Sequence, residues 1–406
     1  MTTASASLPT GRSPGPTYSE MLDLDTHPVR AMFYEDRPGW FGDDDISVSR
    51  YTTREFHDLE KHHVWRTVWQ MACREEHLPH VGDTWLYRVT DIAIQLVRTA
   101  PDRIEATMVG SDAPVAVDSW AGFVFVNPDV DSEPLADFLG EIVDHFAPWH
   151  VETRYVEAHV RKKFRCNWKV VQEAFMESFH VGATHPQQLV RLGDTNTRYD
   201  CWPTFSRALH PSGIPSPYLT WEPTQQEMLD SMLDVRVDEE PPVRIPEGET
   251  LRTFASNVSR ESLRPSIGDE VDRLSDAELL DAMVYTVFPN FHPWAAYQRL
   301  VYRFLPNGDD HETSTMEVFV ISPYVGERPP PAPVLELDFD DSWLLAPALG
   351  ITCRILEQDG FNLPLVQKGL HSTAVSGLRM ALYQESRIRH IHHLLTSYIS
   401  AGGSQP

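Results

Sequence analysis

The chain has 406 residues, of which 41% are hydrophobic, and carries a formal net charge of −25. This length suffices for a sizeable core, which we expect to form one large domain with a smaller one attached. The negative charge disfavours binding to nucleic acid or anionic lipid. No apolar run approaches the roughly 18 residues of a membrane span, and the first residues contain no apolar signal core, so the sequence predicts a cytoplasmic protein without a membrane segment.

The first third of the chain combines an irregular start with short strands. Residues 1–45 are rich in Ser, Pro, Gly and Asp and are predicted to form a flexible arm over another surface. A helix is expected from Tyr51 to Met71, with Thr52 or Thr53 as its N-cap. From Gly82 the hydrophobic period changes to two, which predicts strands at 84–89, 92–98, 103–108 and 120–126. We therefore assign residues 46–130 to a small antiparallel β domain.

The remainder, residues 131–400, is predicted to form the larger domain. Helices are expected at 135–146, at 275–285 (opened by a Ser-Asp-Ala-Glu capping box) and in a tail over 342–400 that Gly350, Gly360 and Pro364 interrupt, with a last helix at 381–400. Strands are expected at 155–164, 198–202, 204–209, 295–305 and 314–322. The acidic, Pro-rich residues 236–270 are predicted to be a surface excursion. Helices flanking a mostly antiparallel sheet indicate the α+β class.

Residues 166–186 carry the strongest chemical signal. They are predicted to form a buried helix that bears Glu173, Glu177 and His180, breaks at Gly182 and delivers His185 before a proline. Acidic residues at i and i+4 and a histidine at i+7 lie along one stripe of a helix. Burying such a stripe is costly unless its members pair with each other or with a metal.

His180 and His185 can share a metal only if the helix ends between them, because five residues correspond to about 140° of rotation on a straight helix. Gly182 as a C-terminal cap would supply that break. Two histidines near a helix end are also typical of a dipole partner and a surface residue. Two histidines and one carboxylate select ferrous iron for oxygen activation. Glu357 and Asp359 are the candidate carboxylates, and the residues alone leave that choice open.

Four groups of motifs resemble the alpha subunit of the Rieske-type aromatic-ring-hydroxylating oxygenases. The resemblance extends from about Arg50 to Leu395. It is carried by the segments 167–169 (Asn-Trp-Lys), 173–180 (Glu-Ala-Phe-Met-Glu-Ser-Phe-His), 184–186 (Thr-His-Pro), 68–74, 82–83, 120–127 (Trp-Ala-Gly-Phe-Val-Phe-Val-Asn), and Asp359 with 367–370 (Gln-Lys-Gly-Leu).

The resemblance implies a helix-grip catalytic domain and a mononuclear non-haem iron oxygenase. It implies His180, His185 and Asp359 as ligands of Fe(II), and Glu177 as the carboxylate that bridges the iron to the electron-donating cluster of a neighbouring subunit. Glu173 is assigned an outer or structural role. The expected substrates are dioxygen and a small hydrophobic, aromatic compound, hydroxylated or dioxygenated as in the breakdown of aromatic hydrocarbons. The expected assembly is a trimer-based homo- or hetero-oligomer.

The chain departs from the family at the Rieske cluster. A Rieske [2Fe–2S] centre needs two cysteines and two histidines, which the family supplies as Cys-x-His and Cys-x-x-His. Neither pattern occurs in the sequence, whose four cysteines are far apart and are expected to be reduced thiols: Cys73, Cys166, Cys201 and Cys353. We therefore expect no [2Fe–2S] cluster in this chain and interpret residues 46–130 as a reduced Rieske-like domain that lacks the cluster loops.

Three outcomes then remain open. A ferredoxin with its reductase, or a cluster-bearing paralogue, could donate electrons in trans. The site could use peroxide, or a substrate that supplies its own electrons. The chain could also be a catalytically silent ligand-binding or assembly subunit that partners an intact paralogue.

Aromatic side chains near the motif are candidates for a substrate pocket, although such residues are also common in a plain core. They are Phe175, Met176, Phe179, Phe288, Phe291, Trp294, Tyr297 and Tyr302. The tail cluster of His390, His392 and His393 is interpreted as a solvated helix end, because adjacent histidines point to different helix faces.

Overall fold

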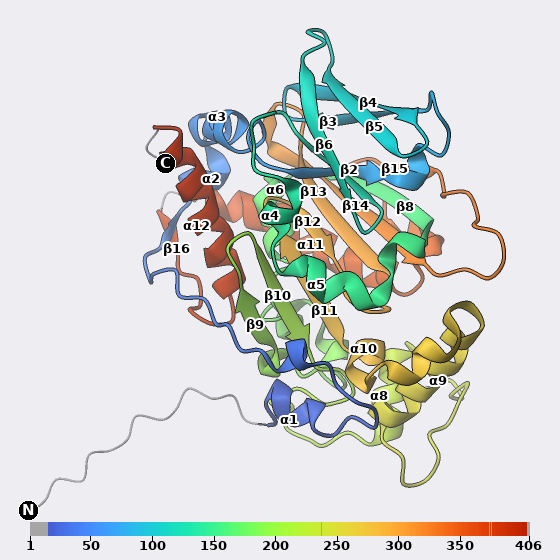
Figure 1. Cartoon of the computed structure of the whole chain (residues 1–406). Helices are drawn as coiled ribbons and strands as arrows, with labels where there is room; N and C mark the ends of the chain where they lie inside the picture. Colours follow the sequence, from blue (N-terminus) through green and yellow to red (C-terminus); the bar gives the residue numbers. More distant parts are fainter. Residues whose placement is uncertain (1–14, 237, 373, 375, 404–406) are drawn as a thin grey trace, which may run out of the picture.

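Two antiparallel sheets and the helices around them make up the computed structural model, which describes residues 15–403 except 237, 373 and 375 (Figure 1). The larger sheet has eight strands in the order β15-β8-β14-β13-β12-β11-β10-β9, and the smaller has six in the order β2-β7-β6-β5-β4-β3. Within the larger sheet only the edge strand β15 runs parallel to its neighbour, β8. The predicted α+β class is therefore confirmed.

The larger sheet carries long buried strands. Its members are β8 (Tyr155–Phe164), β9 (Arg198–Cys201), β10 (Phe205–His210), β11 (Ala282–Val287), β12 (Phe291–Pro293), β13 (Leu300–Asn307), β14 (Asp310–Ser322) and β15 (Val334–Leu337). The centre of β13 and the second half of β14 are buried at every position, because α6 packs against both strands and Arg303 of β13 reaches the smaller sheet. There its Nη1 donates to the carbonyls of Met71 and Ala72 at 2.7 Å each.

The smaller sheet confirms three of the predicted strands and revises the fourth. Its members are β2 (Gln70–Arg74), β3 (Thr84–Val89), β4 (Ile92–Ala100), β5 (Arg103–Met108), β6 (Pro114–Trp120) and β7 (Phe123–Asn127). The predicted strand at 120–126 is confirmed only from Phe123 on, as β7, because the chain turns at Ala121 and Gly122. Gly122 has φ +77°, and a Cβ there would lie 3.0 Å from the guanidinium of Arg74. Phe291 packs edge-to-face on Phe123 and Phe125, so both sheets share one core.

The helices differ from the prediction mainly at their ends. The described α-helices are α1 (Tyr18–Leu22), α2 (Ser49–Thr52), α3 (Arg54–His63), α4 (Leu135–Leu139), α5 (Ile142–Phe146), α6 (Trp168–Glu173), α7 (Val181–Thr184), α8 (Gln225–Met232), α9 (Leu251–Ile267), α10 (Asp276–Leu280), α11 (Thr352–Leu370) and α12 (Ser386–Ala401). Thr53 caps α3, with Oγ1 accepting from the amide of Phe56, but the predicted helix to Met71 is wrong because residues 70–74 pair as β2.

Three further expectations are corrected. The capping box opens α10 as predicted, but that helix ends at Leu280 because residues 282–287 pair with β10. The predicted surface excursion at 236–270 contains all of α9, whose Leu251 is buried with Met228 and Leu229 of α8. Gly360 and Pro364 do not interrupt α11.

The predicted N-terminal arm lies along the larger sheet from Gly15 on, while its residues 1–14 lie outside the described residues (Figure 1). Tyr18 and Phe33 are part of the core. Arg252 of α9 ties the arm down, since its Nη2 donates to Asp25 Oδ1 at 2.7 Å and its Nη1 to Asp281 Oδ1 at 2.6 Å. A two-stranded pairing of β1 (Ile46–Ser47) with β16 (Gly377–Leu378) ends the arm.

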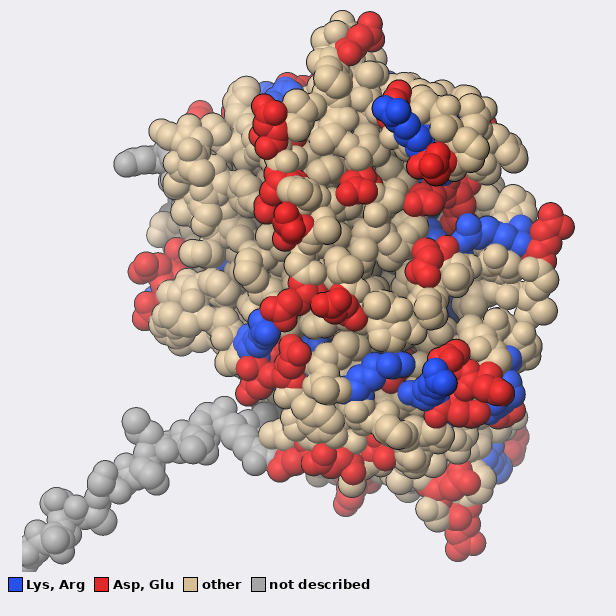
Figure 2. Space-filling view, in the orientation of Figure 1, with Lys and Arg blue, Asp and Glu red and all other residues tan. Residues whose placement is uncertain are grey.

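Among the described residues no helix is both long and apolar enough to cross a membrane. All four cysteines are free thiols. Acidic side chains are spread over the face drawn in Figure 2, where the basic side chains lie next to acidic ones, so the excess negative charge is dispersed on that face.

Candidate metal centre

The predicted long helix at 166–186 is wrong, and its break lies earlier than expected. Helix α6 begins after Asn167, whose side chain accepts from the amide of Lys169 at 3.0 Å, and ends at Glu173, with Ala174 as its C-cap. Ser178 then leaves the helical pattern, because its amide donates to Tyr199 Oη at 3.1 Å and its Oγ donates to the carbonyl of Asp194 at 2.6 Å. Gly182 lies inside the short α7 and does not cap a helix.

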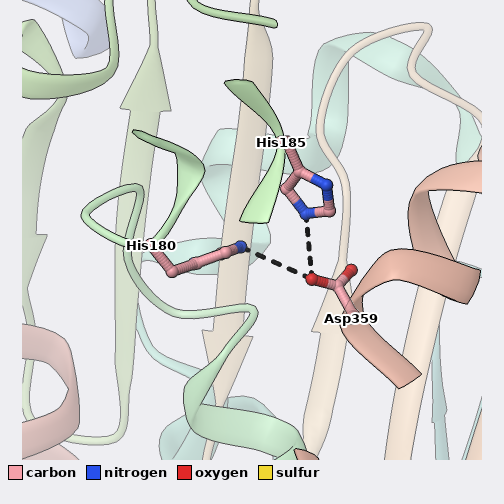
Figure 3. A group of neighbouring side chains, drawn as sticks. All are labelled: His180, His185 and Asp359. Atoms are coloured by element: carbon pink, nitrogen blue, oxygen red, sulfur yellow. Dashed lines mark hydrogen bonds and ion pairs between the residues drawn. The ribbon is translucent and has the colours of Figure 1, made fainter. Parts of the chain in front are cut away.

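This irregular path brings His180 and His185 together at the two ends of α7. Their rings are 5.3 Å apart between centroids and 72° apart in orientation. His185 Nε2 lies 2.9 Å and His180 Nε2 lies 3.6 Å from the same atom, Oδ1 of Asp359 on α11 (Figure 3). Ligand atoms of the three residues all lie within 4.8 Å of one another, which suits a single cation.

The outer ring nitrogens are held by two further side chains. Glu177 Oε1 lies 2.7 Å from His180 Nδ1, and its Oε2 accepts from the His180 amide at 2.9 Å. Gln358 Oε1 lies 2.8 Å from His185 Nδ1. With a metal bound, these acceptors would take the proton of each ring at Nδ1 and leave the Nε2 lone pairs for the ion, as outer-sphere partners of metal-bound histidines do.

Burial and charge act in opposite directions on His180. Burial by itself would lower its pKa, but the hydrogen bond and charge of Glu177, with the charge of Asp359, outweigh that effect and raise the pKa above the ordinary value. His185 and Asp359 are buried, at 2% and 4% exposure. The surroundings therefore favour positive charge at this point, whether it is a proton or a metal ion.

The other candidate carboxylates lie elsewhere. Glu357 Oε2 accepts from the amide of Trp343 at 2.7 Å. Glu173 accepts from Tyr51 Oη at 2.9 Å and lies 2.8 Å from Nε2 of His392, and burial raises its pKa to about 8 against the opposing effects of Tyr51 and of nearby cations. The predicted solvated cluster on the last helix is thus wrong, because His392 and its neighbour His390 are buried.

A cavity of about 310 Å³ opens onto the three residues. Of the predicted aromatic lining, Phe175, Trp294 and Tyr302 form its wall, with Tyr302 edge-to-face against the other two. The remaining predicted residues do not line it: Met176, Phe288 and Phe291 are buried core, Tyr297 packs against the core, and Phe179 is 57% exposed.

The sequence analysis did not identify three residues of the site. Gln358 is next to Asp359 in the sequence, and nothing else in the sequence pointed to it. His210 lines the cavity from β10 as a neutral imidazole, because burial, with the charges of Arg387 and His180, lowers its pKa to about 3. Arg191 also lines the cavity, and no motif singled it out.

Two histidines at the ends of α7 and one carboxylate on α11 face a common cavity. They define a candidate mononuclear metal centre of the type that suits ferrous iron. The family model described as the ring hydroxylating alpha subunit (catalytic domain) matches residues 144–401. The chain belongs to this family.

Similar proteins support the same assignment. Over 163 residues the chain is 28% identical to the oxygenase subunit of glycine betaine monooxygenase from Chromohalobacter salexigens, covering 38% of this chain and 36% of that protein. Over 106 residues it is 28% identical to the oxygenase subunit of carnitine monooxygenase from Acinetobacter pittii, covering 25% of this chain and 28% of that protein. The matched segments span about a third of these relatives.

Solved structures share the fold over most of the chain. A quaternary ammonium Rieske monooxygenase superposes with a TM-score of 0.58 at 14% identity, covering 89% of this chain and 96% of that one. A variant of naphthalene 1,2-dioxygenase bound to phenanthrene superposes with a TM-score of 0.57 at 13% identity, covering 90% and 94%.

Proposed function

We propose that this chain is a mononuclear non-haem Fe(II) oxygenase that acts on a small, hydrophobic substrate. The observation that carries the proposal is the convergence of His180, His185 and Asp359 on one cavity. Their two imidazole nitrogens and one carboxylate oxygen are the donor set that fits ferrous iron and leaves further positions for other ligands. Bound there, the iron would supply the site of dioxygen activation.

The chain's own residues prepare this site. Glu177 and Gln358 hold the two histidine rings by their Nδ1 atoms, which orients both Nε2 atoms before any metal arrives. We assign Glu177 the additional role of bridging carboxylate toward an electron donor in a neighbouring subunit. The rings of Phe175, Trp294 and Tyr302 provide an apolar wall that excludes water from the bound substrate.

Two substrate classes fit this wall. Aromatic compounds would stack against its three rings, which supports hydroxylation or dioxygenation of an aromatic substrate. Quaternary ammonium compounds form the second candidate class, because the similar oxygenase subunits act on glycine betaine and carnitine and because aromatic faces also bind cationic groups. Turnover of one class and not the other, assayed with a supplied reductant, separates them.

We propose that electrons arrive in trans, from a ferredoxin with its reductase or from a cluster-bearing paralogue in a trimer-based, cytoplasmic assembly. The basis is the absence of Cys-x-His and Cys-x-x-His from the sequence. Residues 46–130 are then a reduced Rieske-like domain joined to the catalytic residues 131–400. The competing function is a catalytically silent ligand-binding or assembly subunit.

Metal analysis of protein purified without oxygen tests the proposal. About one iron per chain without acid-labile sulfide is expected, and His180→Ala should lose that iron. His371→Ala is the control, because His371 is exposed and pairs with Glu312. Wild-type protein that takes up no iron when ferrous salt is supplied would rule out the oxygenase and favour the silent subunit.

A further inference from the structure

Arg191 occupies a fixed place in the cavity wall, six residues after His185. Its amide donates to the carbonyl of Gln188 at 3.0 Å, and its carbonyl accepts from the amide of Gly213 at 2.8 Å. Leu192, the next residue, bridges to Ser212. The backbone of Arg191 is therefore held against residues 211–213, and its side chain lines the same cavity as the metal centre.

The guanidinium of Arg191 has no protein partner within the described part of the chain. Its Nε is buried without a hydrogen bond, and no ion pair or side-chain hydrogen bond of Arg191 occurs there. Burial is the one cause that acts on its pKa, which it lowers to about 10, so the group stays cationic at neutral pH. Glu177 and Asp359 line the same cavity but are engaged by the two histidines.

Other buried arginines of this protein have polar partners. Arg154 and Arg387 donate to backbone carbonyls, and three more have a carboxylate. Arg207 has Asp200 at 2.7 Å, Arg252 has Asp281 at 2.6 Å and Arg303 has Glu317 at 2.6 Å. The side chain of Arg191 is half-buried, and a guanidinium whose Nε is buried without a hydrogen bond is costly. Its planar pair of donors matches a carboxylate bidentately, so a ligand carboxylate would provide the compensation that the protein itself does not.

We propose that Arg191 binds a carboxylate of the substrate, which makes the substrate a small carboxylic acid. This inference rests on the proposed function and narrows it. The rest of the acid, which is either a ring or a quaternary ammonium group, lies against Phe175, Trp294 and Tyr302, next to the metal centre. The cavity of about 310 Å³, at the lower end of the usual range for ligand pockets, limits it to a small molecule.

Calorimetry on the full chain with matched acids and amides tests Arg191. The probe pairs are benzoate with benzamide, cyclohexanecarboxylate with its amide, and trimethylammonioacetate with its amide. At least one acid should bind about 10- to 100-fold more tightly than its amide, the range expected for a charged hydrogen bond. Arg191→Gln should abolish the preference and leave amide binding within about threefold, and Arg191→Lys should restore part of it. Arg165→Gln, at an exposed arginine paired with Asp340, is the control.

Each outcome decides the question. The inference is overturned if no acid is preferred over its amide by the wild type, or if the preference survives Arg191→Gln. Should that variant not fold, phenylglyoxal labelling of the wild type replaces it: the preferred acid should protect Arg191 from modification and the amide should not. Each titration is repeated after chelation of metal. If the protein takes up no iron but still binds the acid more tightly than its amide, the result supports carboxylate binding by Arg191. The same result refutes the proposed oxygenase function.

Discussion

Nε2 of His185 lies 2.9 Å from Oδ1 of Asp359, although 174 residues separate them in the chain. The contact exists because α11 docks on α7 along one of its sides. Gln358 reaches His185 Nδ1, and Asn362, one turn further, donates to Thr184 Oγ1 at 3.0 Å. The docking of these two helices therefore sets the geometry of the candidate metal centre.

Asp359→Asn should remove the carboxylate ligand and weaken ferrous iron binding by more than about 100-fold, beyond the 10- to 100-fold effects of outer-sphere changes. Anaerobic iron titration measures it. Glu357→Gln is the matched control on the same helix, because Glu357 caps the amide of Trp343 and should leave the iron affinity unchanged. Equal losses of iron affinity in both variants would show that α11 had been disturbed and that Asp359 had no special role.

Glu177→Gln should keep iron at saturating concentrations, because an amide oxygen can still accept from His180 Nδ1. Its iron affinity should fall by about 10-fold, and turnover driven by a protein electron donor should be lost with the negative charge. Iron occupancy and donor-driven turnover are measured side by side. Full turnover in this variant would exclude the bridging role of Glu177.

Glu317→Gln should lower the free energy of unfolding by about 3–5 kcal/mol, because it leaves the buried Arg303 without its counter-charge. Urea denaturation measures the change. Glu336 is the matched control: it is exposed and pairs with Arg161 at 2.6 Å, so Glu336→Gln should cost less than about 1 kcal/mol. Similar losses of unfolding free energy in both variants would mean that burial of the Glu317–Arg303 pair contributes nothing to stability.

Glu317 should also make stability depend on pH in acid. Burial would raise its pKa, but Arg303, the hydrogen bond from His159 and Arg161 outweigh burial and hold the pKa well below the usual range. Because the folded pKa lies below the unfolded value of about 4.3, this stabilisation is complete above that value and is lost as pH falls below it through the folded pKa. Urea midpoints from pH 7 to pH 3 should fall more steeply for the wild type than for Glu317→Gln, and parallel curves would contradict the assignment.

Arg252→Met should leave the buried carboxylates of Asp25 and Asp281 uncompensated and destabilise the fold by about 3–5 kcal/mol. The effect should be strongest where the arm at residues 15–45 contacts the larger sheet. Limited proteolysis should therefore cut this arm faster than in the wild type. Arg244→Met, at an exposed arginine paired with Glu240, should leave the cleavage rate unchanged, and an unaltered arm in Arg252→Met would show that other contacts hold it.

Local sequence patterns predicted the ends of an element correctly where neighbouring residues alone decide them. The period of two predicted β3 and β5 with their observed ends, and the Ser-Asp-Ala-Glu box predicted the start of α10. The irregular path after α6 could not be predicted, because Ser178 is held there by distant partners at Asp194 and Tyr199. Likewise α11 continues through Gly360 and Pro364 because its buried face outweighs their low helix propensity.

The candidate metal centre shows the same division. The sequence by itself determined the residue types, the spacing of His180 and His185, and a pair of carboxylates on one later helix. Residue types and spacing could not choose between Glu357 and Asp359, and the family resemblance implied Asp359. Residues two apart on a helix differ by about 200° in direction, so only one of the two can face the histidines. The tertiary structure shows which one does, because docking of α11 turns Asp359 toward the histidines and Glu357 toward Trp343. Arg191 carried no local signal at all, because its isolation from counter-charges exists only in the folded chain.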